Sequence, residues 1–236
     1  MTGTPQISQL AEILADKSRA TILMVMMDGE FHTVNELARA AGIKSHTASY
    51  HLAKLTELQW IVMEKHGRFH YYQISNKELA QMLESWLQIS PLKPSRSLNQ
   101  SIENQMLYFG RVCYDHLAGK IGVQITDWLL EKNYIVKSEA GWSLSIEGEN
   151  FFESNGVNIE LLKKEKRCYC RMCLDWSERK HHVAGSVGKA LMNIFFNNQW
   201  IERTGDSRAI KLTTKGKEQL SKKWDIDFES ENKLSE

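Results

Sequence analysis

The side chains best suited to chemistry are cysteines and histidines in the second half of the chain. The 236-residue sequence has four cysteines, and all of them lie after residue 110. The candidate effector or redox residues are Cys113, Cys168, Cys170, Cys173, His116 and His182. Thiolate and imidazole groups bind soft or borderline metal ions, and thiols can also be oxidised. These residues therefore predict a site for a soft metal or metalloid ion, or a redox-active thiol.

The spacing of the cysteines allows several arrangements. Cys168, Cys170 and Cys173 are close enough in sequence to surround one soft ion, and they are the metal-ligand candidates. A closed zinc site needs four ligands, and Cys113 with His116 could supply the missing pair. Further donors are Asp115, Asp175, His181 and His182. The alternative is that Cys113 and Cys173 are small buried residues that only pack. The sequence establishes no cofactor beyond this possible ion.

A small organic effector is a third option for the second half. It could lie in an apolar cleft lined by Trp128, Trp142 and Trp176, although core packing is the commoner use of tryptophan. Enzymatic chemistry is a competing function, because each Cys has His and Asp nearby. No nucleophile elbow, phosphate loop or paired-carboxylate motif accompanies them, so we expect no enzyme. A purely structural second half also stays open.

An internal repeat surrounds these residues. RVCYD at 111–115 matches RMCLD at 171–175, and HLAGKIG at 116–122 matches HVAGSVG at 182–188. An apolar helix, a short strand signal and an L-x-x-x-G segment then follow in both copies. The predicted helix–hairpin–helix units span about 108–159 and 168–226. Because neither unit can bury a core alone, we expect them to pack about a pseudo-two-fold axis.

A second group of side chains has the properties needed to read DNA. From Ser45 onward a helix is predicted in which Ala48, Leu52 and Leu55 share an apolar face. Polar and cationic side chains on other faces could bind base edges and phosphates. The candidate DNA-binding residues on this helix are Ser45, His46, Thr47, Ser49, Tyr50, His51 and Lys54.

Local signals position this helix within a larger motif. Thr33 is expected to cap a helix over 34–41, with Glu36 as its capping-box partner. Gly42 allows the sharp turn that follows, and Ser45 is expected to cap the next helix. Two helices joined in this way predict a helix-turn-helix.

An aromatic hairpin follows the two helices. Residues 60–63 and 69–74 read as strands, with a turn at His66-Gly67. Lys65 and Arg68 lie at its tip, where a basic side chain can reach phosphates or the minor groove. The hairpin is therefore predicted to be the wing of a winged helix-turn-helix, which places one helix face in the major groove.

Four linked motifs in roughly the first 90 residues resemble the ArsR/SmtB family of bacterial winged-helix regulators. They are LADKSRATIL at 14–23, NELARAAG at 35–42, TASYHLAKL at 47–55 and GRFHYY at 67–72. The resemblance implies binding to a double-stranded DNA operator and repression relieved by an effector. Lys44 and Tyr50 depart from the family's usual Ser and Arg, so the operator sequence stays open.

The family's usual metal sites lack their ligands in this sequence. Residues 33–37 contain no Cys, and residues 77–88 contain no His or Asp. The second half resembles the carboxy-terminal extension of a long subgroup of these regulators. That resemblance does not imply what the extension senses.

Two apolar helix stripes predict a homodimer. The first comprises Ile7, Leu10, Ala11 and Leu14, and the second comprises Leu79, Met82, Leu83, Trp86 and Leu87. A small winged domain cannot bury both, although they could instead fold back on their own domain. The family resemblance favours the homodimer, which would read a two-fold related operator.

The expected fold class is mainly α with small β-hairpin wings (α+β). The predicted domains are a DNA-binding and dimerisation domain at 1–92, a proline-containing linker at 93–105 and a sensor domain at 106–236. The net charge is only +1, which argues against non-specific coating of nucleic acid. No apolar run is long enough for a membrane span, and no signal peptide is evident. The sequence predicts a cytoplasmic bacterial protein that is nucleoid-associated when bound to DNA.

Overall fold

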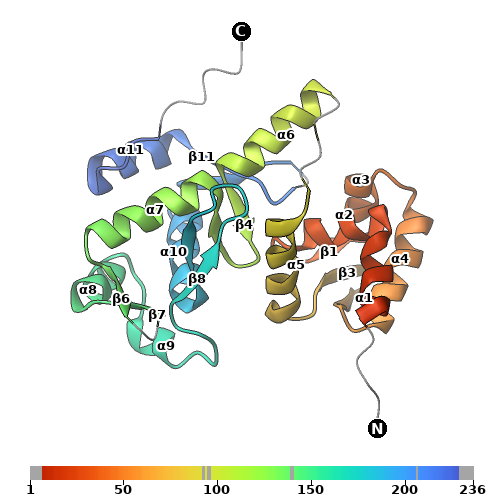
Figure 1. The fold of residues 1–236 in the computed structure, drawn as a ribbon, viewed down its shortest axis with the longest axis horizontal. Helices are drawn as coiled ribbons and strands as arrows, with labels where there is room; N and C mark the ends of the chain where they lie inside the picture. The colour runs from red at the N-terminus through yellow and green to blue at the C-terminus, as the bar shows by residue number, and fades with distance from the viewer. Residues whose placement is uncertain (1–6, 92–93, 95–96, 139–140, 206, 229–236) are drawn as a thin grey trace. The chain divides into compact units, whose positions relative to one another are not determined.

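The computed structural model describes residues 7–91, 94, 97–138, 141–205 and 207–228 (Figure 1). The chain divides into two units. Unit 1 comprises Met1–Trp86 with Gly205–Arg208, and unit 2 comprises Leu87–Thr204 with Ala209–Glu236. Helices and short antiparallel strands occur in both units, so the mixed helix and strand content is confirmed.

Unit 1 has the element order of a winged helix-turn-helix. Its elements are α1 (Ile7–Ala15), α2 (Lys17–Met26), β1 (His32–Thr33), α3 (Val34–Ala41), α4 (Ser45–Glu57), β2 (Ile61–His66), β3 (Phe69–Ile74) and α5 (Lys77–Ile89), whose last turn passes into unit 2. The strands form an antiparallel sheet in the order β1-β3-β2. The winged helix-turn-helix predicted from the sequence is therefore confirmed.

The predicted start and end of α3 are confirmed. The Thr33 side chain accepts a hydrogen bond from the Glu36 backbone, and the Glu36 carboxylate accepts one from the Thr33 backbone at 2.7 Å. Gly42 ends the helix with φ 65°, a left-handed conformation that glycine adopts without strain. The core then buries Leu37, Ala48 and Leu52 completely or almost completely.

Two local predictions in unit 1 are wrong. Lys44, not Ser45, occupies the N-cap position of α4, and its side chain makes no capping hydrogen bond. The Ser45 hydroxyl instead donates to Asn35 Oδ1 of α3 at 2.8 Å. In the wing, His66 pairs with Phe69, so the turn residues are Gly67 and Arg68 and not His66 and Gly67. Each shift is one residue, because the local sequence allows a helix cap or a hairpin turn at adjacent positions.

Unit 2 begins with a helix where the sequence predicted linker. Its elements are α6 (Leu98–Phe109), β4 (Arg111–Cys113), β5 (His116–Ala118), α7 (Gly119–Glu131), β6 (Ile135–Ser138), β7 (Gly141–Leu144), α8 (Ile146–Ser154), α9 (Ile159–Lys163), β8 (Arg171–Leu174), β9 (His181–Ala184), α10 (Gly185–Asn197), β10 (Ile201–Arg203), β11 (Ile210–Leu212) and α11 (Thr214–Trp224). Residues 98–105, expected to be linker, form much of α6. Ser97 caps this helix by accepting from the Gln100 backbone.

The order hairpin, helix, hairpin, helix occurs twice in unit 2. The first series runs from β4 to α8, and the second from β8 to α11. The hairpin that opens each series was not predicted as strand structure from the sequence. Both hairpins lead directly into a helix through a glycine with positive φ, 75° at Gly119 and 79° at Gly185. A Cβ at either glycine would lie 2.7 Å or less from a backbone carbonyl oxygen.

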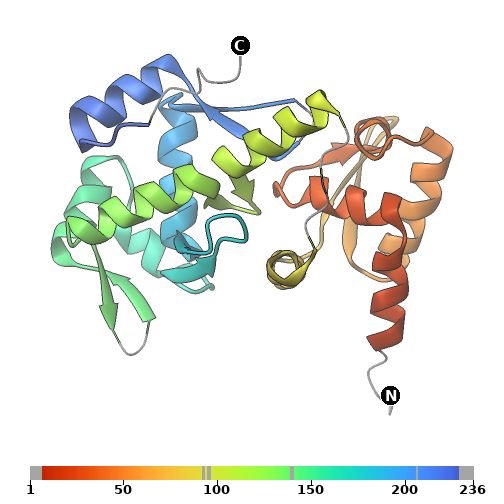
Figure 2. The same cartoon turned by 45° about the horizontal axis from the view of Figure 1, so that its top comes forward.

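Each long helix of unit 2 packs against the hairpin of the other series. Helix α7 contacts β9, and α10 contacts β5 (Figures 1 and 2). The Thr126 hydroxyl of α7 makes one such link, since it accepts a hydrogen bond from the Val183 backbone of β9 at 3.0 Å. Strands β5 and β9 also contact each other. The two hairpins therefore meet in the interior of unit 2.

Candidate functional site

The exposed face of α4 carries much of the predicted DNA-binding set. Ser45, His46, Ser49 and Tyr50 are exposed, and 65% of the Tyr50 surface is accessible. The Tyr50 ring meets the neighbouring His51 ring edge-on, with ring centres 5.7 Å apart, and most of its surface is open to solvent. The face presents hydroxyl, imidazole and phenol groups, which can form hydrogen bonds with base edges or phosphates.

His51 does not lie on this face. Its side chain is buried, with 6% of its surface accessible, and its Nε2 lies 3.8 Å from Asp16 Oδ1. The position follows Tyr50 directly, and one step along a helix turns the side chain by about 100° toward the core. Thr47 and Lys54 are half-buried, and Lys54 Nζ lies 3.6 Å from Glu12 Oε1 of α1.

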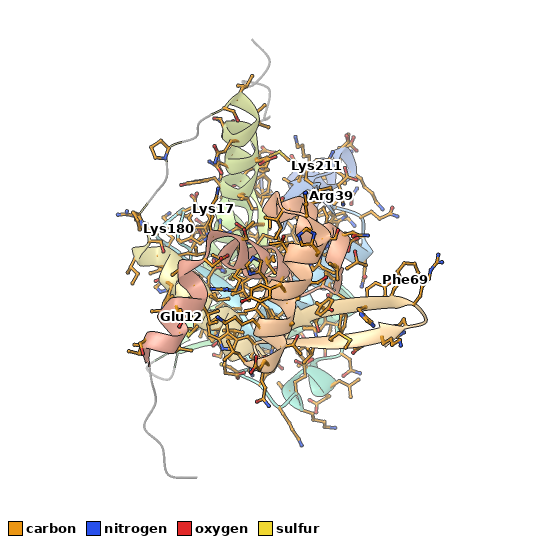
Figure 3. The ribbon with its side chains drawn as sticks, turned by 90° about the vertical axis from the view of Figure 1, so that its right-hand side faces the viewer. Glu12, Lys17, Arg39, Phe69, Lys180 and Lys211 are labelled. Atoms are coloured by element: carbon orange, nitrogen blue, oxygen red, sulfur yellow. The ribbon has the colours of Figure 1, made fainter. Side chains whose placement is uncertain are left out.

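The wing projects its basic residues into solvent. Residues 62–70 are exposed, including Lys65 and Arg68, and Figure 3 shows the hairpin extending beyond the helices with Phe69 near its end. The Arg68 guanidinium lies 5.1 Å from the centre of the Phe69 ring. A cation held by an aromatic ring in this way remains available to phosphate.

A cluster of thiols and imidazoles lies inside unit 2. The ligand atoms of Cys113, His116, Cys173 and His182 are all within 4.8 Å of one another, and all four residues are buried. Cys113 faces His116 across β4 and β5, and Cys173 faces His182 across β8 and β9. The His116 and His182 Nε2 atoms are 3.1 Å apart. Four residues predicted as separate candidates are thus brought together.

The His116 ring is held from behind by a carboxylate. Its Nδ1 lies 3.4 Å from Asp115 Oδ1, and Asp115 is also paired with Arg167. Burial opposes ionisation of Asp115, but the hydrogen bonds from His116 and Arg167 outweigh it and lower its pKa to about 2. Asp115 therefore stays ionised and orients the ring.

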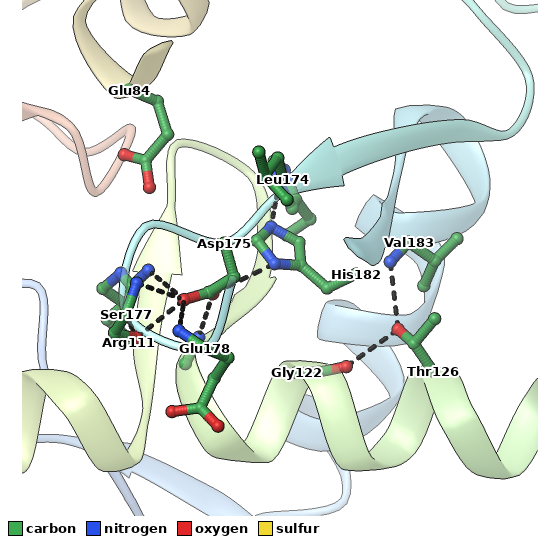
Figure 4. Close-up of polar contacts among 12 residues, drawn as sticks. Glu84, Arg111, Gly122, Thr126, Leu174, Asp175, Ser177, Glu178, His182 and Val183 are labelled. Carbon is green, nitrogen blue, oxygen red and sulfur yellow. Dashed lines mark hydrogen bonds and ion pairs between the residues drawn. The ribbon is translucent and has the colours of Figure 1, made fainter. Parts of the chain in front are cut away.

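The carboxylate of Asp175 lies behind the His182 ring as Asp115 lies behind His116, and the Asp175 side chain is more deeply buried (Figure 4). The His182 Nδ1 atom lies 3.1 Å from Asp175 Oδ2, and Asp175 Oδ1 accepts from the Arg111 guanidinium at 2.9 Å. The Asp175 carboxylate also accepts from the Gly119 and Ser177 backbones at 2.7 and 2.9 Å. Burial opposes ionisation, yet the His182 hydrogen bond and the Arg111 charge hold the pKa of Asp175 well below its usual range.

The prediction that Asp115 and Asp175 are further direct donors differs from their positions in the structure. They lie behind the two histidines, outside the group of four ligand atoms. The pairing of Arg167 with Asp115 joins residues 52 positions apart, and the pairing of Arg111 with Asp175 joins residues 64 positions apart, so neither can be read from local sequence. His181 is exposed and stands at the edge of the Trp142 ring.

Cys168 and Cys170 are not part of the cluster formed around Cys173. Cys168 is exposed, and Cys170 is buried in the main hydrophobic core of unit 2. Burial raises the pKa of the Cys170 thiol to about 12. A thiol that stays protonated is a poor nucleophile. The structure groups Cys173 with Cys113, His116 and His182, and not with Cys168 and Cys170 as the predicted three-thiolate arrangement requires.

The tryptophans considered for an effector cleft have packing contacts. Trp128 stacks on Trp224 with ring centres 5.0 Å apart, and Trp142 is buried in the same core. Trp176 lies over the Arg111 guanidinium at 4.2 Å. A cavity of about 370 Å³ in unit 2 is lined by residues of 155–165 and 186–198, and none of these tryptophans lines it. Within the described residues, no helix is long and apolar enough to cross a bilayer.

Comparison with known proteins identifies the chain's relatives. Residues 16–59 match the bacterial regulatory protein arsR family. Over 213 residues the chain is 43% identical to the uncharacterized HTH-type transcriptional regulator YdfF of Bacillus subtilis (strain 168), covering 90% of this chain and 94% of that one.

Solved structures similar to this chain cover little more than a third of it. A homodimeric winged helix-turn-helix DNA-binding domain from Mycobacterium bovis is 23% identical with a TM-score of 0.32, covering 38% of this chain and 88% of that one. The antimony-specific transcriptional repressor AntR is 25% identical with a TM-score of 0.33, covering 35% of this chain and 75% of that one. The 43% identity to YdfF spans nearly the full length of both chains, and the arsR match covers α2, α3 and α4 of unit 1. This chain therefore belongs to the ArsR-type HTH transcriptional regulators of bacteria and is a DNA-binding protein.

Proposed function

We propose that this regulator is a repressor that inserts α4 into the major groove of its operator and places the wing against the adjacent backbone. The observation that carries the proposal is the exposed face of α4, with Ser49 and Tyr50 opposite a buried leucine core. Exposed hydrogen-bonding groups on a helix that protrudes from a rigid core are what base readout requires. Lys65 and Arg68 supply contacts to phosphate.

The repressor is proposed to bind as a homodimer built on α1 and α5. Ile7 on α1 and Ile89 on α5 are 76% and 84% exposed in the single chain, and Leu10, Leu14, Leu79 and Met82 are half-buried. Leu83 is buried within its own chain, so it belongs to the core and not to the proposed interface. Burying the remaining apolar area in a symmetric interface would place two copies of α4 on one side of the dimer, as a two-fold related operator needs.

Unit 2 is proposed to be a duplicated sensor domain that modulates operator binding, in a protein that works in the cytoplasm. The twofold element order and the matching R-x-C-x-D segments support the duplication. Cys113 and Cys173 are only 3% and 8% exposed. A catalytic thiol must be reached by its substrate, so this burial favours a regulator over a thiol-dependent enzyme.

Operator binding by the full chain tests the DNA-binding proposal. The reduced protein is titrated against a labelled duplex from its own promoter region and against a scrambled duplex of equal length. The paired change Ser49→Ala and Tyr50→Ala should weaken binding to the promoter duplex far more than binding to the scrambled one. Arg68→Ala should weaken both, whereas Lys137→Ala, on an exposed basic residue of the β6–β7 hairpin in unit 2, should weaken neither. Equal loss in the Arg68 and Lys137 variants would refute the role of the wing.

Sedimentation velocity tests the dimer. Ile7→Glu introduces a charge at a site that is exposed in the single chain, so folding should be preserved while the dimer is lost. The neighbouring exposed residue Ser8 provides the matched control, Ser8→Glu. A monomeric wild-type chain at micromolar concentration would overturn the homodimer.

A further inference from the structure

We propose that Cys113, His116, Cys173 and His182 form a closed tetrahedral site for one Zn²⁺ ion, which joins the β4–β5 hairpin to the β8–β9 hairpin. The site lies wholly in unit 2 and does not depend on the proposed role of α4 in DNA binding. It also differs from the predicted three-thiolate arrangement, because it takes one Cys and one His from each hairpin.

The backbone register provides the four ligands in two equivalent pairs. Cys113 and His116 are direct cross-strand partners, as are Cys173 and His182. Directly opposed residues have Cβ atoms about 5 Å apart on one face of the hairpin, so each pair presents its side chains together. The contact between β5 and β9 brings the two pairs face to face. Neither hairpin alone has more than half of a tetrahedral ligand set.

The distances between ligand atoms agree with a zinc tetrahedron. Usual Zn–N and Zn–S bond lengths at tetrahedral angles place two nitrogens about 3.3 Å apart and two sulfurs about 3.8 Å apart. The two Nε2 atoms are 3.1 Å apart, and all four ligand atoms lie within 4.8 Å of one another. Small side-chain rotations would therefore close the site around an ion.

The orientation of the histidines suits a metal ion between them. Each Nδ1 faces a carboxylate, Asp115 at 3.4 Å for His116 and Asp175 at 3.1 Å for His182, so each Nε2 is the nitrogen that faces the group of four. In a neutral ring with its proton on Nδ1, the Nε2 atom is an acceptor with a lone pair. The two Nε2 atoms lie 3.1 Å apart, a separation that two nitrogen ligands of one metal ion would have. A metal ion can accept the lone pairs of both Nε2 atoms, and a carboxylate behind each ring strengthens both ligands.

Charge balance also favours a divalent ion with two thiolates. The outer carboxylates are already compensated, since Asp115 pairs with Arg167 and Asp175 pairs with Arg111. The inner group therefore needs to be neutral, because isolated buried charge is costly. Zn²⁺ with two thiolates and two neutral imidazoles has no net charge. The absence of carboxylate oxygen from this group of four disfavours Mg²⁺ and Ca²⁺, which require oxygen ligands.

Such an ion would contribute directly to the stability of unit 2. Its ligands come from segments about 60 residues apart in sequence, and the unfolded chain would not hold them together. With all four positions filled by protein, no coordination site remains for a substrate. The proposed role is thus a structural link between the two halves of unit 2.

Cobalt substitution of the full-length chain tests the site. The reduced, chelator-treated protein is titrated with Co²⁺ under anaerobic conditions and then with Zn²⁺. We expect saturation at one Co²⁺ per chain, with the visible absorption of a tetrahedral cobalt ion and a thiolate-to-cobalt charge-transfer band. Adding one equivalent of Zn²⁺ should displace the Co²⁺ and abolish both absorption features. Failure of the wild-type chain to bind either ion in reducing buffer would overturn the proposal, with no need for a variant.

Matched cysteine variants assign the ligands. Cys113→Ser and Cys173→Ser should each reduce the thiolate-to-cobalt absorption and weaken Zn²⁺ binding by more than about 100-fold, beyond the usual effect of an outer partner. Cys168→Ser changes an exposed thiol in the same way and should leave the spectrum unchanged. If a Cys113 variant fails to fold, Asp115→Asn replaces it, because the Asp115 side chain is partly exposed and contacts the His116 ring and not the ion itself. It should weaken Zn²⁺ binding about 10- to 100-fold with the spectrum retained. A spectrum lost in Cys168→Ser, or a Zn²⁺ affinity unchanged in Asp115→Asn, would overturn the assignment.

Discussion

The buried ion pair between Arg111 and Asp175 should dominate the stability of unit 2. Both side chains are fully buried, with Arg111 Nη2 at 2.9 Å from Asp175 Oδ1. Asp175→Asn keeps the size of the side chain but removes the charge that the buried Arg111 guanidinium contacts at 2.9 Å. Breaking a buried pair in this way costs about 3–5 kcal/mol, because the remaining charge cannot be hydrated. That is a large fraction of the ~5–15 kcal/mol that stabilises a typical domain.

Urea unfolding followed by tryptophan fluorescence measures this cost. With a slope of about 2 kcal/mol per molar urea, a loss of about 4 kcal/mol should lower the unfolding midpoint by about 2 M. The matched control is Asp127→Asn, since Asp127 lies 3.4 Å from Lys180 Nζ but both side chains are largely exposed. An exposed pair contributes about 0–1 kcal/mol, so the control midpoint should move little. The same small shift in both variants would refute the conclusion that Asp175 neutralises a buried arginine.

Three further outcomes follow from particular contacts. Replacing Tyr50 by Ala should cost about 1–3 kcal/mol of promoter affinity in an anisotropy titration if the ring contacts a base, and unchanged affinity in a folded variant would remove Tyr50 from the interface. Thr33→Ala removes the capping hydrogen bonds at the start of α3 and should destabilise unit 1 by ~1 kcal/mol in thermal unfolding, whereas the exposed Ser8→Ala should have no measurable effect. In the native protein, brief alkylation at neutral pH read by mass spectrometry should modify the exposed Cys168 and spare Cys170, whose pKa burial raises to about 12; rapid labelling of Cys170 would contradict its buried position.

The features of unit 1 were predictable because local interactions specify them. The Thr33–Glu36 capping box involves residues three positions apart, and Gly42 meets a local backbone requirement. The spacing of Ala48, Leu52 and Leu55 sets the buried face of α4 in any fold that packs this helix. The two errors in unit 1 were also local, because the predicted N-cap of α4 and the predicted wing turn each differ from the observed position by one residue. The burial of His51 was missed because a helix surface changes from exposed to buried between adjacent residues.

In unit 2 the sequence by itself determined which side chains are available and that they recur at matching positions. Only the tertiary structure decided which of them meet. Sequence proximity favoured Cys168 and Cys170 as companions of Cys173, yet Cys173 lies beside Cys113, 60 residues away. The physical reason is that strand register brings Cys and His together across each hairpin, and long-range packing then brings the hairpins together. Neither the register of an unpredicted hairpin nor the contact between two such hairpins can be read from residue spacing along the chain.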